Sequence, residues 1–331
     1  MRHGGRTMQK PAPGRKPPAL IVCGPTTSGK SALALELAER FGGTVINADA
    51  MQCYAGLRVI TAQPGPEDEA RAPHRLYGVR DPSRPADVAW WRQAALAEME
   101  RAALPILCGG TGMYLRALTQ GISALPEVSE AARAEARALL AERGPEAVHA
   151  LLDAETAAKL RPGDSQRVTR ALEIQISTGR GLASWQREAP VLPPAPWAFG
   201  AILLDPPREA LRAAIAARFD AMLAGGAIEE VRALLHLDPA LPAMRAHGVP
   251  ELAAMLRAEM TPAQARDRAI LNTGQYTKRQ ATWFRHQALV APNALHMIHA
   301  RFAGLAQFSE SEQEKLVTFV RRAVDAASQD E

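Results

Sequence analysis

The chain has 331 residues, of which 47% are hydrophobic and 22% charged, the profile of a soluble globular protein long enough for two folded units. Its 39 Lys and Arg against 35 Asp and Glu give a net charge of +4, which fits a polyanionic partner without requiring one. No apolar run reaches membrane-spanning length. The three cysteines, Cys23, Cys53 and Cys108, lack metal-site spacing, so we expect free thiols and a cytoplasmic location.

The first part of the chain predicts a parallel sheet. Residues 1–18 are basic and rich in Pro and Gly but lack a hydrophobic region, which indicates a flexible tail and not a signal peptide. From Ala19 to Gly121 strands and helices alternate, the pattern of a parallel α/β fold. Strands are predicted over residues 19–23, 44–47 and 104–108, and helices over residues 31–41 and 113–120.

The pattern changes after residue 122, where strand signals give way to helical periodicity. Helices are predicted over residues 130–143, 146–152 and 165–177, followed by a stiff proline-rich linker over 190–196 and a strand over 199–204. Further helices are predicted over residues 208–223, 228–237, 261–286 and 312–327. The simplest organisation is an α/β core of residues 19–122 and 197–300, an all-helical insertion of residues 123–196, and a helical tail of residues 301–331.

Residues 24–31 fit the phosphate-binding loop pattern G-x-x-x-x-G-K-[ST], placed between a predicted strand and a predicted helix. Two glycines let the backbone turn its N–H groups inward, the lysine adds a positive charge, and the last hydroxyl can bind Mg²⁺. The loop consists of Gly24, Pro25, Thr26, Thr27, Ser28, Gly29, Lys30 and Ser31. This P-loop predicts an NTPase-like parallel sheet flanked by helices, and a ligand that carries a diphosphate or triphosphate.

The carboxylate that should accompany such a loop stands in an unusual place. Phosphotransferases with a P-loop place an Asp at the end of a neighbouring strand to hold Mg²⁺, but the strand over 104–108 runs into Gly109-Gly110-Thr111-Gly112. The available carboxylate is Asp49, after the second strand. Because the carboxyl ends of parallel strands share one edge, Lys30, Asp49 and Thr111 should converge on one crevice. Asp49 could instead cap a helix, but its position opposite the loop favours catalysis.

Taken together, these motifs resemble those of the tRNA dimethylallyltransferase family. The matching segments are residues 24–31, 49–52 (Asp-Ala-Met-Gln), 73–76 (Pro-His-Arg-Leu), 109–114, 164–173, 276–280 and 282–285. They occur in order between about Ala19 and Arg285. The first segment is shared by many NTPases, whereas the whole set in this order is specific.

The resemblance implies a reaction. In this family the loop holds the diphosphate of dimethylallyl diphosphate, and the prenyl group moves to the N6 amine of the adenosine 3′ of the anticodon, tRNA position 37, in tRNAs that read codons beginning with U. Since no phosphoryl group moves, an acidic strand is not needed. Lys30, the loop amides and Mg²⁺ on Ser31 would stabilise the leaving diphosphate, while Asp49 would accept the proton of the amine.

Further residues gain roles through the same resemblance. Thr111 matches a threonine that touches the reacting substrates, although it could be a simple turn residue. Arg245 aligns with an arginine near the diphosphate, and a structural role is as plausible. The adenine must leave its stack to reach the crevice, so the enzyme has to hold the anticodon stem-loop. The tRNA-binding candidates are Asp49, Ala50, Met51, Gln52, Thr111, Arg133, Gln166, Arg167, Val168, Thr169, Arg170, Lys278 and Arg279.

Some of these assignments have structural alternatives. Residues 166–170 could be a solvated helix face. Tyr276, Arg279, Gln280 and Trp283 share one helix face by their spacing, and such a stripe can belong to the core or contact RNA. The chain departs from the usual family pattern at Ala50, Gln63, His247 and Gly274, which bears on tRNA grip and donor affinity.

Two other functions compete with prenyl transfer. A small-molecule kinase would bind ATP at the loop, but it needs a second acidic Mg²⁺ ligand that is not found after residues 104–108. A non-catalytic RNA-binding protein could use the loop as an anion site. We expect a monomeric enzyme whose partners are tRNA and dimethylallyl diphosphate, with no membrane association.

Overall fold

The computed structural model describes residues 16–123, 125–188 and 191–325. The described chain forms two compact units, one of residues 16–120 with 195–325 and the other of residues 121–194, without 124 and 189–190. Among the described helices, none combines the length and the apolarity that crossing a bilayer requires.

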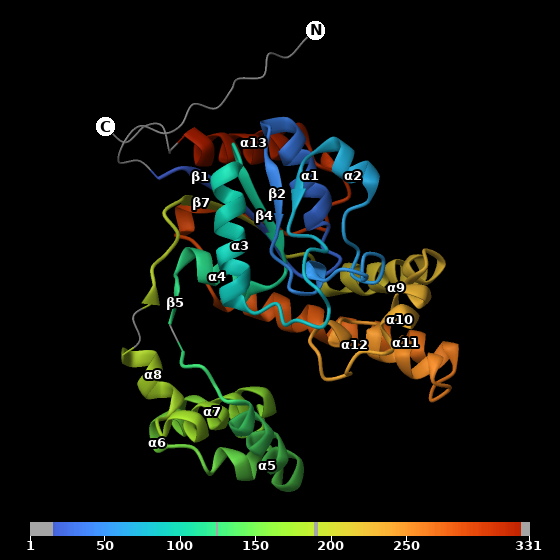
Figure 1. Cartoon of the computed structure of the whole chain (residues 1–331). Helices are drawn as coiled ribbons and strands as arrows, with labels where there is room; N and C mark the ends of the chain where they lie inside the picture. The colour runs from blue at the N-terminus through green and yellow to red at the C-terminus, as the bar shows by residue number, and fades with distance from the viewer. Residues whose placement is uncertain (1–15, 124, 189–190, 326–331) are drawn as a thin grey trace. The chain divides into compact units, whose positions relative to one another are not determined.

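The first unit is built on a six-stranded sheet in the order β3-β2-β4-β1-β7-β8, with every neighbouring pair parallel (Figure 1). The central strand β1 places Val22 opposite both Cys108 of β4 and Ile202 of β7, so segments before and after the insertion share one sheet. The strands are β1 (Pro18–Cys23), β2 (Thr44–Asn47), β3 (His74–Arg75), β4 (Pro105–Gly109), β7 (Ala198–Leu204) and β8 (Leu295–Ile298). The predicted α/β class is therefore confirmed.

Alternate residues of the strands point to opposite faces of the sheet and pack in two buried layers. Leu20 and Val22 face α1 (Lys30–Phe41) and α13 (Glu310–Asp325), while Ile21 faces the opposite layer. That opposite layer is built from α3 (Val88–Arg101), α4 (Gly112–Thr119) and the end of α12 (Pro262–His286). Each central strand is thus buried on both faces, as its continuous apolar sequence requires.

The predicted C-terminal tail, residues 301–331, is not separate from the core where the structure describes it. Helix α13 buries Leu316, Val317 and Val320 against the sheet, in the same cluster as Leu20 and Val22. An amphipathic helix must cover its apolar face, and here the sheet provides the surface.

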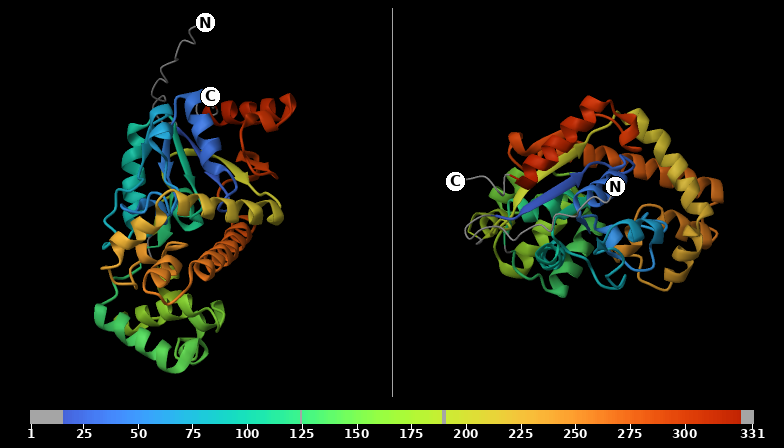
Figure 2. Two further views of the ribbon diagram at one scale, coloured as in Figure 1. Left: turned by 90° about the vertical axis from the view of Figure 1, so that its right-hand side faces the viewer. Right: turned by 90° about the horizontal axis from the view of Figure 1, so that it is seen from above.

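Helices between β7 and β8 form a third cluster beside the sheet. They are α9 (Arg208–Ala224), α10 (Ala227–Leu234), α11 (Val249–Leu256) and α12, and Figure 2 shows α9 and α12 side by side in yellow and orange. Their apolar faces cover Tyr54, Leu57 and Ile60 from the segment after β2, which is followed by α2 (Pro66–Arg71). The carboxylate of Glu230 accepts hydrogen bonds from the backbone N–H groups of Val59 (2.7 Å) and Ile60 (2.9 Å), which fixes that segment.

The second unit is mainly helical but not entirely so. It contains α5 (Glu130–His149), α6 (Ala154–Lys159), α7 (Ser165–Thr178) and α8 (Leu182–Glu188). Helix α5 is interrupted at Gly144 (φ 76°), which matches the two helices predicted there. Strands β5 (Ile122–Ser123) and β6 (Val191–Leu192) pair antiparallel, so the all-helical prediction and the linker prediction for residues 190–196 were both wrong at β6. Pro190 lies outside the described residues.

Candidate active site

The P-loop joins β1 to α1 and presents free backbone donors. Gly29 stands immediately before α1 with φ 90°, and no side chain caps the helix. The first N–H groups of α1 therefore remain available, and the helix dipole adds positive potential at the same point. At Gly24 (φ 149°) a Cβ atom would lie 2.5 Å from the carbonyl oxygen of Leu204, so only glycine fits. The loop geometry is that of an anion site.

Two polar groups of the loop, on Lys30 and Ser28, lack partners among the described residues. Lys30 is 8% exposed, and its ammonium makes no hydrogen bond or ion pair with any described residue. Burial lowers the pKa of Lys30, and the nearby Asp49 carboxylate opposes that shift. The hydroxyl oxygen of Ser28 is also buried without a partner. Because buried polar groups are normally satisfied, this cluster indicates that an anionic ligand completes it.

A cavity of about 270 Å³ opens in front of the loop. Lys30 and Ser31 line one wall, Asp49 and Gln52 line another, and α9 contributes Arg218. Arg218 is half-buried, and its one hydrogen bond among the described residues runs from Nη2 to the carbonyl oxygen of Thr61 (3.3 Å). Burial lowers its pKa, and the carboxylate of Asp49 opposes the shift. A guanidinium that makes one hydrogen bond and no ion pair has donors left for phosphate oxygens.

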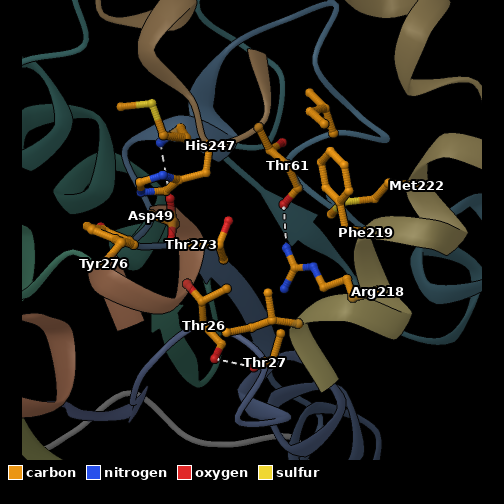
Figure 3. A pocket seen from close by; sticks show the side chains of 13 residues that line it. Thr26, Thr27, Asp49, Thr61, Arg218, Phe219, Met222, His247, Thr273 and Tyr276 are labelled. Atoms are coloured by element: carbon orange, nitrogen blue, oxygen red, sulfur yellow. Dashed lines mark hydrogen bonds between the residues drawn. The ribbon is translucent and has the colours of Figure 1, made fainter. Parts of the chain in front are cut away.

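A second, smaller cavity shares part of this lining and is more apolar (Figure 3). Thr26, Thr27, Asp49, Thr61 and Arg218 belong to both cavities. The added residues are Met51, Ile60, Ile215, Phe219, Met222, His247, Thr273 and Tyr276. The crevice therefore has a cationic end at the P-loop and a largely apolar end, and Asp49 lies where the two meet.

Asp49 is held with one oxygen available. Its backbone N–H donates to Oδ1 of Asn47 (2.8 Å), and its own Oδ1 accepts from the N–H of Met51 (3.1 Å). Oδ2 has no hydrogen-bond partner among the described residues. The side chain is half-buried at the end of β2. A carboxylate oriented by one oxygen and open at the other can accept a proton from a substrate.

Thr111 supports the Asp49 segment from the neighbouring strand. Its hydroxyl accepts a hydrogen bond from the N–H of Ala50 (3.0 Å), and its own N–H donates to the carbonyl of Ala48 (3.2 Å). The structure thus brings Lys30, Asp49 and Thr111 to one edge of the sheet. Thr111 is not part of the lining of either cavity.

Helix α12 ties the two glycine-containing loops together. The side-chain oxygen of Gln280 accepts from the N–H (2.8 Å) and hydroxyl (3.0 Å) of Thr26, and its Nε2 donates to the carbonyl of Gly110 (3.0 Å). Gln280 is 4% exposed, and a Cβ at Gly112 would lie 2.2 Å from the Trp283 ring. Gln280 and Trp283 therefore have structural roles. Of the two possibilities left open by the spacing of this helix face, core packing and RNA contact, these two residues follow the first.

The other members of that helix face behave differently. Tyr276 lines the apolar cavity, and its ring packs against His247 with ring centres 4.4 Å apart. Arg279 is exposed, with its guanidinium 5.6 Å from the centre of the Tyr276 ring. Lys278 is also exposed on α12.

Arg245, which is predicted near the diphosphate, and Arg218 occupy different environments. Arg245 lies exposed on a short 3-10 helix (Ala243–Arg245) and lines neither cavity. Arg218, which sequence reasoning missed, lines both cavities. A signal existed, because Arg218 shares the α9 face of Leu211, Ile215 and Met222, where a charged residue interrupts an apolar stripe.

Of the residues predicted to contact tRNA in the second unit, some are exposed and others are buried. Gln166 and Arg167 are exposed at the start of α7, but Val168 and Thr169 are 0% and 8% exposed. Helical periodicity turns the side chains of these two residues into the core of this unit, which leaves them little surface for a partner. Arg170 is half-buried and paired with Glu173 (2.9 Å). Arg133, on α5, is exposed and pairs with Glu130 (3.3 Å).

The six-stranded parallel sheet and the P-loop at the end of its central strand define a P-loop α/β protein. Two models of known families match the chain. The IPP transferase model matches residues 52–287, and the isopentenyl transferase model matches residues 18–82. The chain therefore belongs to the IPP transferase family.

Individual relatives agree with this assignment. The chain is 57% identical over 94% of its length to a tRNA dimethylallyltransferase of Gluconobacter oxydans, of which 96% is covered. It is 58% identical over 92% of its length to that of Acidiphilium cryptum, of which 94% is covered.

Solved structures show the same fold. The full-length tRNA isopentenylpyrophosphate transferase of Bacillus halodurans is 28% identical, with a TM-score of 0.66 over 95% of this chain and 98% of that one. A eukaryotic dimethylallyltransferase solved while acting on tRNA matches with a TM-score of 0.73 at 23% identity, over 94% of this chain and 80% of that one.

Proposed function

We propose that this protein transfers the dimethylallyl group of dimethylallyl diphosphate to the N6 amine of adenosine 37 in the anticodon stem-loop, in tRNAs that read codons beginning with U. The observation that carries the proposal is the two-ended crevice, in which Asp49 lies between unpaired cations and an apolar wall. Its relatives at 57% and 58% identity are named tRNA dimethylallyltransferases.

The cationic end suits the leaving group. As the bond between the prenyl carbon and oxygen breaks, its electron pair passes to the diphosphate, and negative charge grows there. Lys30, Arg218 and the free N–H groups of α1 stabilise that charge without rearrangement, because they are already buried and oriented. The apolar end, with Ile215, Phe219 and Met222 among its lining, suits the prenyl chain.

The residues at the loop fit a Mg²⁺ ion. Ser31 lines the cavity in front of the loop and would hold the ion through its hydroxyl, and Mg²⁺ would take its remaining ligands from water and phosphate oxygens. The described residues contain no group of three or more His, Cys, Asp or Glu side chains that could hold a metal ion. When bound, it would supply additional positive charge to the leaving group.

Asp49 serves as the base in this proposal. The adenine amine attacks the prenyl carbon, a carbon–nitrogen bond forms, and the proton lost by the amine passes to Oδ2 of Asp49. This oxygen is the unpaired one, and Met51 fixes the other. Proton removal during attack contributes on the order of a hundred- to ten-thousandfold to the rate.

A kinase function is not favoured by the same crevice. Among the described residues that line its two cavities, Asp49 is the sole carboxylate, and a kinase would need a second acidic ligand at the neighbouring strand. That strand, β4, ends in the glycine segment that packs on α12.

The test is the Asp49→Asn enzyme. We expect prenyl transfer to an unmodified tRNA transcript to fall by at least about a hundredfold, while tRNA affinity changes little, because the amide keeps the shape but cannot accept the proton. Mass spectrometry of the digested tRNA nucleosides measures the product. Asp267→Asn, at a side chain 77% exposed on α12, is the matched control and should retain activity. Unchanged turnover in Asp49→Asn would show that another group is the base.

A further inference from the structure

The segment that follows β8 closes over the P-loop. The N–H of Phe302 donates to the carbonyl of Ser28 (2.8 Å), and the carbonyl of Phe302 lies so close to Gly29 that a Cβ there would be 2.0 Å away. The Phe302 side chain is 2% exposed and belongs to the α1 side of the core. Backbone and side chain of Phe302 therefore fix this segment against the loop.

Gln307 braces the same segment from its other end. Its Nε2 donates to the carbonyl of Arg301 (2.7 Å), and its Oε1 accepts from the N–H of Ala303 (2.7 Å). Arg301 is thus held between the buried Phe302 and the Gln307 brace. Its position does not depend on its own side chain.

The guanidinium of Arg301 uses one of its hydrogen-bond donors and leaves the others free among the described residues. Nε donates to the carbonyl of Thr27 (2.8 Å), which orients the group, and the side chain lines the same cavity as Lys30 and Arg218. Among the described residues, neither Nη atom has a hydrogen-bond partner, and no carboxylate forms an ion pair with Arg301. A half-buried guanidinium that is tethered at one nitrogen and open at two others can bind an oxyanion through a pair of parallel hydrogen bonds.

We propose that Arg301 is a binding residue for the diphosphate of the prenyl donor, placed there by the segment after β8. The inference rests on the proposed function for the nature of the ligand. Arg301 would bind phosphoryl oxygens from the C-terminal side of the loop, and Arg218 would bind them from α9. The donor site is then built by three separated stretches of chain: the P-loop, α9 and the segment around Arg301.

Calorimetric titration with inorganic diphosphate tests this directly. Arg301→Ala should weaken diphosphate binding about ten- to a hundredfold, the effect of losing hydrogen bonds to a charged group. Arg301→Lys should fall between wild type and Arg301→Ala, because it keeps the charge without the fork of donors. Arg321→Ala, an exposed arginine on α13, is the matched control and should bind as wild type does.

A second measurement separates ligand binding from a structural role. If Arg301 acts on the ligand, Arg301→Ala unfolds like wild type without ligand, and added guanidinium ion at non-denaturing concentration restores part of the diphosphate affinity. Weak binding that accompanies loss of stability without rescue would show that Arg301 only braces Thr27, and would overturn the proposal. Equal affinity of wild type and Arg301→Ala overturns it as well. If wild type itself binds no diphosphate, the proposed function fails too.

Discussion

His247 lies at the apolar end of the crevice, where its ring packs on Tyr276. Burial lowers the pKa of His247, and the charge of Arg279 lowers it further, while Glu251 and Asp49 act in the opposite direction. The folded protein thus holds this imidazole neutral at pH values where the unfolded chain begins to protonate it. Between the two pKa values the unfolded state binds more protons, so stability must rise with pH in that window.

The prediction is a pH dependence that His247 causes. As the pH falls from about 7 through the unfolded value near 6.5 towards the lower folded pKa, wild type should lose free energy of unfolding that His247→Leu does not lose. Urea unfolding of both proteins across this range gives the difference. Parallel curves for the two proteins would assign the pH dependence to other groups.

At the scale of single elements, helix α12 both packs in the core and links two loops. Its far end belongs to the core layer opposite α1, and Gln280 in its middle links the P-loop to the loop after β4. Gln280 is buried, and its bond to the carbonyl of Gly110 is shielded from water, whereas its bonds to Thr26 are partly buried. One side chain therefore sets the spacing between the P-loop and the segment that supports Asp49.

Replacing Gln280 by Leu should lower the free energy of unfolding by about 1–3 kcal/mol, since the carbonyl of Gly110 is left buried and unpaired and the N–H of Thr26 loses its partner. Prenyl transfer should fall as well, because the loops lose their common support. Chemical denaturation measures the first effect. Gln275→Ala, five residues earlier and exposed on the same helix, is the control and should change stability by less than about 0.5 kcal/mol. Similar losses in both variants would argue against the bridge.

Some strands could be predicted from the sequence and others could not. The runs that became β1, β2, β4 and β7 are continuous and apolar because both faces are covered, so they were predictable. The short strands β3 and β8 have no such run, and β5 and β6 hold two residues each, too few for a period to show. Arg301 was out of reach for another reason, because only folding brings its distant segment to the P-loop. Arg218 left a signal in the apolar stripe of α9, but its place beside the P-loop also arises only on folding. Asp49 could be placed because strand ends in a parallel sheet share an edge.

At the scale of the whole molecule, the charge predicts how tRNA is held. The exposed arginines of the second unit include Arg133 and Arg167, and their ion pairs with Glu130 (3.3 Å) and Asp164 (3.5 Å) are on the surface. Such pairs contribute little and are easily exchanged for phosphate contacts. Binding to a polyanion then releases counterions, which makes affinity depend steeply on salt.

The logarithm of tRNA affinity should fall linearly with the logarithm of salt concentration. The double variant Arg133→Ala/Arg167→Ala should reduce this slope by about 1–2, since each phosphate contact contributes about 0.7–0.9. Arg321→Ala/Arg322→Ala on α13 is the matched pair in the first unit and should keep the slope. Filter binding at several salt concentrations gives both values. A flat response in wild type would rule out an electrostatic hold on RNA.

The two ends of the inserted unit meet within the fold. The N–H of Ala195 donates to the carbonyl of Leu118 (2.7 Å) where the chain leaves and re-enters the first unit, and β5 pairs with β6 just beyond. Such adjacent exit points mean that a short connection could close the gap at little entropic cost. During evolution this excursion could therefore lengthen, shorten or be exchanged for another without disturbing the register of the strands beneath it, which leaves the chemistry free to stay constant while the grip on RNA diversifies.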